Sequence, residues 1–418
     1  MYLYLGSGIC LNTEFTLFFS EEKQQLIITN NNRIFIMQDL KKKNRIFYYD
    51  GFTQFANTGD LLINKTLLDI ISSKGMIVVN DAKMPVSYKN ELLYDVSNVL
   101  LVSENLTNLS FSRMIIDSLL KNFIFKKTEI YILENPGHHI SKLIKPGKSH
   151  YKDFFKKYVQ SMLGCNILKI GVTLGPYSDS MSIFYSRISK LYHSILIRDF
   201  KTLELTNQFN FSNVSYIPDL AWAYNHDKFV RTPTVEIPKT KYIVISFRDA
   251  IEGTIRNSDY YNQIQNSIEQ ILKANLGYTI VFSFQVAYDR EVCKDFVALF
   301  GAKYDVVFID NCLSISDAMH LYSNSEMVIS NRLHVLLLAI KSKTLPVAIT
   351  NVSQHNKLVS MFYDENVNEC VIDVESLDLT NQLDALYNQK DMILNKFDLI
   401  VKKNMQLIIR GINQIFKV

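Results

Sequence analysis

The chain has 418 residues, of which 48% are apolar and 21% charged, with 14 glycines and 8 prolines. This composition is typical of a globular protein, excludes a fibrous or disordered one, and at this length suits two domains. The net charge of +4 is too small to indicate a nucleic-acid-binding surface, and no nucleic-acid-binding motif is present.

The cysteines and the N-terminus indicate the compartment. Five widely spaced cysteines without a Cys-x-x-Cys pair suit a reducing environment and provide no metal framework. No basic segment precedes the first apolar residues, so a signal peptide is not expected, and no run of about 18 apolar residues could span a membrane. We therefore expect a cytoplasmic protein without a metal site, which would meet a membrane only at its surface.

Short β-like runs separated by polar turns fill residues 1–45 and predict a β-rich extension. From residue 46 the pattern changes to strands alternating with helices, beginning with a strand at 46–49, a loop at 50–60 and a helix at 61–75. Further strands are expected at 76–80, 98–102, 129–134, 167–175 and 193–199. Such alternation predicts a mostly parallel sheet covered on both faces, here a first α/β domain over 46–230.

A polar stretch at 225–241 that contains Pro233 and Pro238 marks the domain boundary. The second domain, 240–375, repeats the alternation. Its expected strands are 242–247, 279–284, 305–310, 326–330 and 345–350, and its expected helices are 258–275, 288–300, 315–323 and 332–342. Residues 378–418 form an amphipathic helical tail that we expect to return to the first domain. The fold class is therefore α/β, with two doubly wound, Rossmann-like domains.

The stretch "ISNRLHVLLLAI" places two basic residues where the strand at 326–330 meets a helix. Ligands of open α/β sheets bind at such strand ends. With Ser330 or Asn331 as N-cap, Arg332 and His334 fall in the first turn. A cation there opposes the helix dipole by roughly 0.3–1 kcal/mol, whereas an anionic ligand reverses the sign. A neutral His334 could take a proton near pH 7. The alternative is a solvated Arg332 and a core His334.

Seven segments follow the order and spacing of one family. They are "NTGDLLINKTLLDII" (57–71), "GVTLGP" (171–176), "ILIRDFKTLEL" (195–205), "IPDLA" (217–221), "VISFRD" (244–249), "VFSFQVAYDREV" (281–292) and "VISNRLHVLLLAI" (328–340). From about residue 46 to 360 the chain resembles the polysaccharide pyruvyl transferases. These enzymes move a pyruvyl group from phosphoenolpyruvate to a sugar as a ketal, on a two-domain fold like that of GT-B glycosyltransferases. Two departures are "ENPGHH" (134–139), where the family often has a Gly-rich turn, and residues 1–45, which have no counterpart.

The resemblance implies roles at the donor site. Phosphoenolpyruvate carries a carboxylate and a phosphate, so it needs fixed cations. Arg332 and Arg198 are the implied main clamps, with Leu333 beside Arg332 in the same R-L-H motif. His334 is implied as the acid/base catalyst, acting with Arg332. Further donor-site candidates, which are alternatively ordinary surface residues, are Arg248 and Lys357. No cofactor is expected besides phosphoenolpyruvate, which is a co-substrate.

At the acceptor site the resemblance implies Asn57 and Asp60, and His138 or His139 could take the place of the missing Gly-rich turn. The alternative role of Asp60 is to cap the following helix. We expect the acceptor to be a sugar in a surface polysaccharide or its lipid-linked precursor.

Lysines interleave with apolar residues over 141–158, which favours peripheral contact with an anionic membrane. The alternative is a solvated charged face. The lysines are Lys142, Lys145, Lys148, Lys152, Lys156 and Lys157.

Two other functions stay open. A GT-B-type glycosyltransferase with a nucleotide-sugar donor would need a carboxylate for the donor ribose, for which "DVVFIDN" (305–311) or Glu326 is available. A non-catalytic protein of polysaccharide assembly is the second alternative.

Overall fold

The computed structural model describes residues 44–104, 111–125, 128–229, 231–250, 256–274 and 277–416, together with the backbone of four short strands before residue 38. These four strands, β1 (Gly8–Cys10), β2 (Thr16–Ser20), β3 (Gln25–Asn30) and β4 (Arg33–Met37), pair antiparallel in chain order. The β-rich N-terminal extension is thereby confirmed.

The first domain is built on a parallel sheet in the order β12-β11-β10-β8-β5-β6-β7, with β9 beside β10. Its strands are β5 (Asn44–Asp50), β6 (Met76–Asn80), β7 (Val99–Leu101), β8 (Thr128–Glu134), β9 (Gly137–His139), β10 (Asn166–Leu174), β11 (Tyr192–Ile197) and β12 (Val214–Tyr216). Its helices are α1 (Thr58–Ser72), α2 (Val86–Leu92), α3 (Phe111–Phe125), α4 (Lys148–Met162), α5 (Asp179–Ser189) and α6 (Phe200–Gln208). Strands with both faces buried need near-continuous apolar runs, and successive residues 47–49 of β5 are buried.

The second domain has a six-stranded parallel sheet in the order β15-β14-β13-β16-β17-β18. The strands are β13 (Tyr242–Ser246), β14 (Thr279–Phe284), β15 (Val306–Cys312), β16 (Met327–Ser330), β17 (Leu345–Thr350) and β18 (Val371–Asp373). The helices are α7 (Ser258–Ala274), α8 (Arg290–Phe300), α9 (Ile315–Ser323), α10 (Leu333–Lys341), α11 (Asn356–Asp364) and α12 (Leu379–Asn388). This is the Rossmann order 3-2-1-4-5-6, whose ligand-binding switch point lies between its first and fourth strands, here β13 and β16.

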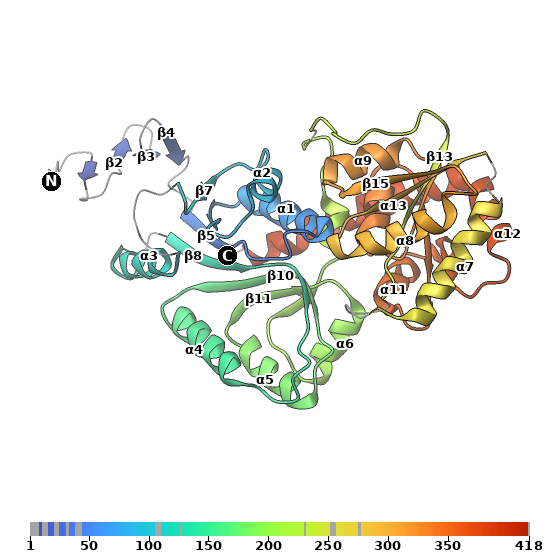
Figure 1. Ribbon diagram of the computed structural model, residues 1–418. Coiled ribbons are helices and arrows are strands. Elements are labelled where there is room, and N and C mark those ends of the chain that lie inside the picture. The colour runs from blue at the N-terminus through green and yellow to red at the C-terminus, as the bar shows by residue number, and fades with distance from the viewer. Residues whose placement is uncertain are drawn as a thin grey trace.

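The C-terminal helix α13 (Lys390–Ile415) joins the two domains (Figure 1). It packs on α10 and α12 of the second domain and on the 3₁₀ helix η1 (Leu220–Ala223) of the first. A Cβ on Gly411 would lie 2.5 Å from Ile217 of the first domain, so the helix approaches closely there. Arg45 donates to the carbonyl of Phe416 over 3.4 Å. The expected return of the tail to the first domain is confirmed.

One lysine of the expected basic face is buried. Lys157, on the inward side of α4, lies 3.0 Å from Glu134 and 2.5 Å from Asp153. The grouping of Lys157 with the exposed lysines is therefore wrong, because a carboxylate at the end of β8 offers it a buried partner. In the described ranges, none of the helices combines the length and hydrophobicity needed to cross a lipid bilayer.

A pair of truncations on α13 tests its role in the shared core. Ile408 is fully buried in the apolar cluster that extends through both domains, whereas Leu399 on the same helix is 68% exposed. We expect Ile408→Ala to lower the free energy of unfolding by about 2–5 kcal/mol and Leu399→Ala to change it by no more than about 0.5 kcal/mol. Urea unfolding followed by circular dichroism measures both. Equal losses for the two variants would contradict the placement of α13.

Candidate active site

The N-terminus of α1 docks on the second domain. Asn57 caps the helix, because its side-chain oxygen accepts from the backbone N–H groups of Gly59 (3.0 Å) and Asp60 (3.3 Å). The N–H of Thr58 donates to the carbonyl of Gln285 in the second domain over 2.9 Å. The alternative capping role of Asp60 is therefore wrong. Its carboxylate instead accepts from Thr53 at 3.1 Å, and burial raises its pKa, an effect opposed by His334.

His334 lies across the domain interface, against this helix end. A Cβ on Gly59 would lie 2.3 Å from the Nδ1 atom of His334, so only a glycine leaves room for the ring. On its other side, Nε2 of His334 is 3.6 Å from an Oδ2 atom of Asp219 in the first domain. The imidazole is thus held between two elements of the first domain, although it belongs to the second.

The start of α10 differs from the expectation. The N-cap is Arg332, and the helix begins at Leu333, which is partly buried and packs against the core. Asn331 cannot cap because its side chain accepts from the N–H of Arg248 (2.9 Å) and donates to the carbonyl of Arg248 (2.8 Å). Ser330 accepts from the N–H of Arg332 at 2.9 Å. This N–H precedes the first helical residue, Leu333, so the bond does not cap the helix. His334 falls in the first turn as expected, whereas Arg332 precedes it.

Arg198 is buried and forms an ion pair. Its Nη1 lies 2.6 Å from an Oδ2 atom of Asp219, and its Nε donates to Thr173 at 3.1 Å. Burial alone would raise the pKa of Asp219, but Arg198 and then His334 hold it well below its usual range. Asp219 is therefore an ionised group shared by Arg198 and His334.

Lys357 reaches this group from the start of α11. Burial, and then the charge of Arg198, lower the pKa of Lys357 to about 7, against the opposing effect of Asp219. Its ammonium has no hydrogen-bond or ion-pair partner in the part of the chain that the structure describes. The amine is thus placed to bind an anion, which would stabilise its charged form.

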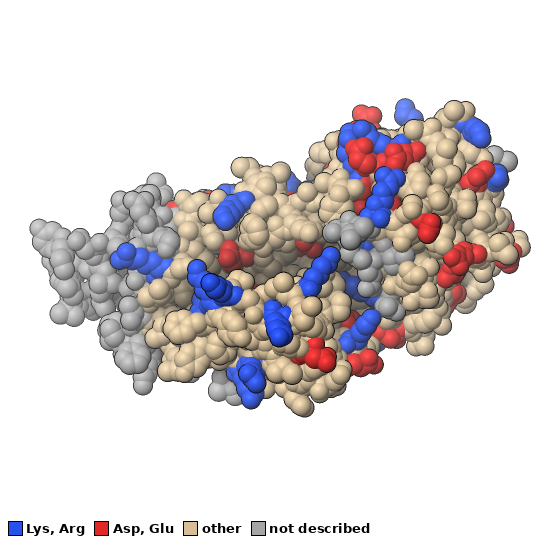
Figure 2. All heavy atoms as spheres, turned by 60° about the horizontal axis from the view of Figure 1, so that its bottom comes forward, with Lys and Arg blue, Asp and Glu red and all other residues tan. Residues whose placement is uncertain are grey.

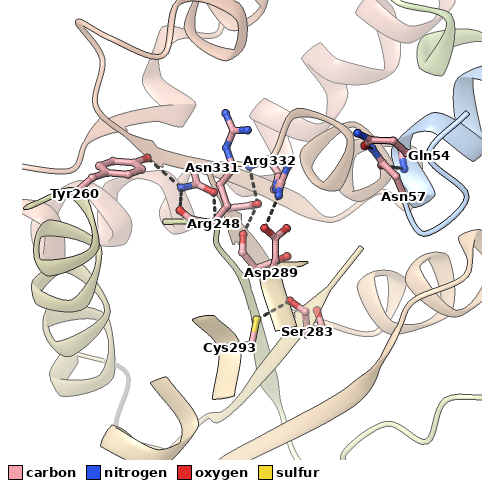
Figure 3. A network of polar contacts seen from close by, with 12 residues as sticks. Gln54, Asn57, Arg248, Tyr260, Ser283, Asp289, Cys293, Asn331 and Arg332 are labelled. Carbon is pink, nitrogen blue, oxygen red and sulfur yellow. Dashed lines mark hydrogen bonds and ion pairs between the residues drawn. The ribbon is translucent and has the colours of Figure 1, made fainter. Parts of the chain in front are cut away.

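A second group of cations lies at the switch point between β13 and β16 (Figure 3). Arg332 pairs with Asp289, and Arg248 donates to Nε2 of His355 over 2.6 Å. Burial, and then Arg332, lower the pKa of Arg248 to about 10. Burial, and then Arg248, lower the pKa of His355 to about 3, which keeps it a neutral acceptor. The charges of Arg332 and Lys357 also reach His355, so the two groups of cations are neighbours.

The segment "ENPGHH" forms β9 and the turn before it. The Nε2–H of His138 donates to the carbonyl of Gly175 at 2.6 Å, and that of His139 donates to Asn135 at 3.3 Å. Burial, and then Lys169, lower the pKa of His139 to about 3. The structure thus places His139 among charged groups of the first domain, with Glu134 and Lys169, and both imidazoles bind main-chain carbonyls.

Three residues of the site were missed by sequence reasoning, namely Asp219, Asp289 and His355, and Asn331 was considered only as a helix cap. Asp219 and Asp289 lie within the segments "IPDLA" and "VFSFQVAYDREV", so the family segments held a signal for both. Among the described residues, no three His, Cys, Asp or Glu side chains gather as they would around a metal ion.

Similar solved structures define the class of fold. A glycosyltransferase from Rickettsia africae superposes with a TM-score of 0.51 at 12% identity, covering 90% of this chain and 98% of that one. A UDP-GlcNAc 2-epimerase from Methanocaldococcus jannaschii gives a TM-score of 0.50 at 10% identity, covering 82% and 93%. The two Rossmann-like domains thus have the expected GT-B-like arrangement.

The family is set by the sequence itself. The family model for polysaccharide pyruvyl transferase matches residues 57–353. The chain belongs to this family of transferases, and it contains both groups of cations within or next to the matched range. A search of the curated proteins found no match.

The contact of His334 with Gly59 predicts a coupled pair of variants. Gly59→Ala should destabilise the protein by about 1–3 kcal/mol through overpacking, although alanine favours a helix. Gly59→Ala in a His334→Ala background should cost much less, because the ring is absent. Gly147→Ala is the control, since its new Cβ would have its nearest neighbour, His150, 3.9 Å away. Unfolding midpoints in urea measure the cycle; additive effects would contradict the contact.

Lys357 predicts a dependence of stability on pH. Its pKa falls from 10.5 in the unfolded chain to about 7 in the folded protein. Between these values the unfolded state binds more protons, so this site costs least stability at high pH and most below pH 7. The free energy of unfolding of wild type relative to Lys357→Met should therefore rise from about pH 6 to about pH 9. Lys402→Met, at an exposed position of α13, should show no such trend, and a flat difference for Lys357→Met would contradict the prediction.

Proposed function

We propose that the chain transfers a pyruvyl group from phosphoenolpyruvate to hydroxyls of a sugar in a surface polysaccharide or its lipid-linked precursor, forming a ketal. The observation that carries the proposal is the meeting of His334, Arg198 and Lys357 around Asp219 at the domain interface, next to the second group of cations that contains Arg332. Family membership supports pyruvyl transfer to a polysaccharide. The expected cytoplasmic location stays a prediction.

The cations suit an anionic donor. Arg332 keeps one terminal nitrogen beyond its bond to Asp289, and the Lys357 ammonium has no hydrogen bond among the residues described. A bound phosphate and carboxylate would offset the repulsion among these cations and stabilise the protonated form of Lys357. Arg198 is bound to Asp219 and Thr173, so it presents only its remaining edge to a ligand.

His334 and Asp219 suit the proton transfers. In the proposed reaction the methylene carbon of phosphoenolpyruvate gains a proton, and two acceptor hydroxyls bond to the carbon that loses phosphate. The two hydroxyls lose two protons in total. One balances the proton added to the methylene carbon, and the other leaves with phosphate. His334 would relay a proton, and Asp219, 3.6 Å from its Nε2, would stabilise the charged imidazole. The reaction needs phosphoenolpyruvate as co-substrate and no further cofactor.

The acceptor is proposed to meet the first-domain side of the interface. Asp60 lies beside His334 at the start of α1, and Asn57 fixes this turn through its cap. His138 and His139 form an adjacent candidate surface. They follow Gly137 on β9, and a Cβ added to Gly137 would lie 3.9 Å from Ile63 on α1.

A nucleotide-sugar donor is less well supported by the same contacts. Glu326 precedes β16, at the end of the sheet opposite the site, and pairs with Lys390 at 3.1 Å. Asp310 pairs with Arg290 at 2.5 Å. Both carboxylates are thus paired with basic side chains, and structural neighbours at 10–12% identity show the fold alone.

Ligand-dependent thermal stability tests the donor. Phosphoenolpyruvate at 100 times its dissociation constant should stabilise wild type by about 2.7 kcal/mol. Arg332→Ala should lose most of this gain, because it removes a fixed cation, whereas exposed Arg410→Ala should keep it. UDP-, GDP- and CMP-sugars are measured in parallel.

The outcomes separate the three functions. A shift with a nucleotide sugar alone would contradict pyruvyl transfer and favour a glycosyltransferase. The absence of a shift with any of these ligands would favour a non-catalytic assembly protein.

A further inference from the structure

Exposed apolar side chains concentrate in one segment of the first domain. Nine large ones fall between residues 140 and 163, whereas other described segments carry such residues singly or in small groups. A contiguous exposed apolar surface generally marks an interaction site, because scattered single residues are the ordinary case. The nine are Ile140, Leu143, Ile144, Tyr151, Phe155, Tyr158, Val159, Met162 and Leu163.

Helix α4 orders part of this surface into two rows. Tyr151, Phe155, Tyr158 and Met162 follow one another at spacings of four, three and four, which places them along one side of the helix. Their exposed fractions range from 44% to 70%. Lysines at 148, 152 and 156 form the neighbouring row at spacings of four.

The opposite side of α4 is fixed to the domain. Lys157 is buried between Glu134 and Asp153, and Phe154 packs toward Phe184 with ring centroids 6.4 Å apart. The outward orientation of the apolar row follows from this anchoring. We name the exposed residues of the loop 140–147 and of α4 up to residue 163 the α4 face.

The α4 face is positively charged. Its exposed lysines are opposed within the segment by one exposed acidic residue, Asp153, which is already paired with Lys157. Figure 2 shows this underside of the first domain as a mainly uncharged surface with basic side chains distributed across it. The exposed lysines are Lys142, Lys145, Lys148, Lys152 and Lys156.

We propose that the α4 face docks the protein on the surface of an anionic lipid bilayer. An amphipathic helix lies in the bilayer interface when apolar side chains reach the acyl boundary and lysines meet anionic headgroups. Lysine stems can extend along the apolar row while their ammonium groups stay in the headgroup region. A protein partner would gain from the apolar row, but an evenly spaced lysine row beside it is matched best by a continuous anionic surface.

Docking itself does not depend on the chemistry of the site. Its role in bringing the site to a lipid-linked acceptor rests on the proposed function. Ile140, the first residue of the α4 face, directly follows His139 of β9. A protein docked in this way would hold its candidate acceptor strand near the bilayer, where the sugar of a lipid-linked acceptor is found.

Vesicle co-sedimentation of the full chain tests the docking. Wild type should bind vesicles of phosphatidylglycerol and phosphatidylcholine at least about tenfold more strongly at low than at high salt, and more strongly than phosphatidylcholine alone. Replacing Lys148, Lys152 and Lys156 by Gln should weaken binding by roughly a hundredfold, from about fivefold per lysine. Phe155→Ser with Met162→Ser should also weaken it by about tenfold or more.

Matched variants elsewhere serve as controls. Lys201, Lys303 and Lys402 are exposed and, replaced together by Gln, should keep most of the binding. Leu399→Ser with Leu407→Ser removes two exposed apolar side chains from α13 and should also keep it.

Failure of wild type to bind anionic vesicles, or wild-type binding by the α4 variants, would overturn the proposal. The proposal would also be overturned if the wild-type protein is a dimer that dissociates in the Phe155→Ser, Met162→Ser variant while vesicle binding stays unchanged. The stabilisation by phosphoenolpyruvate, measured on the same α4 variants, should persist. The absence of this stabilisation in wild type would count against pyruvyl transfer. The absence of vesicle binding alone would count only against docking.

Discussion

The interdomain site depends on the buried ion pair of Arg198 with Asp219. Both side chains are almost inaccessible, so each charge needs the other to offset its loss of solvation. Removing one partner of such a pair typically costs about 3–5 kcal/mol, because the remaining charge stays buried and unpaired. The same carboxylate lies beside His334, which belongs to the other domain. One interaction therefore supports the first domain and also sets the electrostatic environment of the candidate catalytic residue.

The second domain contributes more positive charge to the site than its neighbouring carboxylate balances. Arg248, Arg332 and Lys357 lie near one another, and Asp289 forms an ion pair with Arg332. Burial lowers the pKa values of Arg248 and Lys357, and so do the charges of Arg332 on Arg248 and of Arg198 on Lys357, which shows the cost of gathering these cations. An anion bound among them would reduce that cost, and a doubly charged one would do so more than a singly charged one. The topology makes the gathering possible, because the switch point brings the ends of β13 and β16 together and Asn331 ties them.

Much of the fold follows from local pattern. The strands at 279–284 and 345–350 and the helix at 315–323 match their predicted ranges, because short apolar runs bounded by polar turns determine them. The site could be predicted only in part. Arg332 and His334 stand out because basic residues are unusual at a helix start, whereas Asp219 gains its role from Arg198, 21 positions away.

Long-range partners also explain two of the local errors. Asn331 was expected to be able to cap α10, but its amide is taken by the backbone of Arg248, 83 positions away. Lys157 was expected on an exposed face, but Glu134 binds it 23 positions earlier in the chain. Periodicity carries no information about such pairs. Glu134 also accepts from Tyr192 and pairs with Lys169, and it lies three residues before β9. A single carboxylate thus anchors α4 to the sheet three residues before the strand that holds His138 and His139, which places the α4 face next to the candidate acceptor strand.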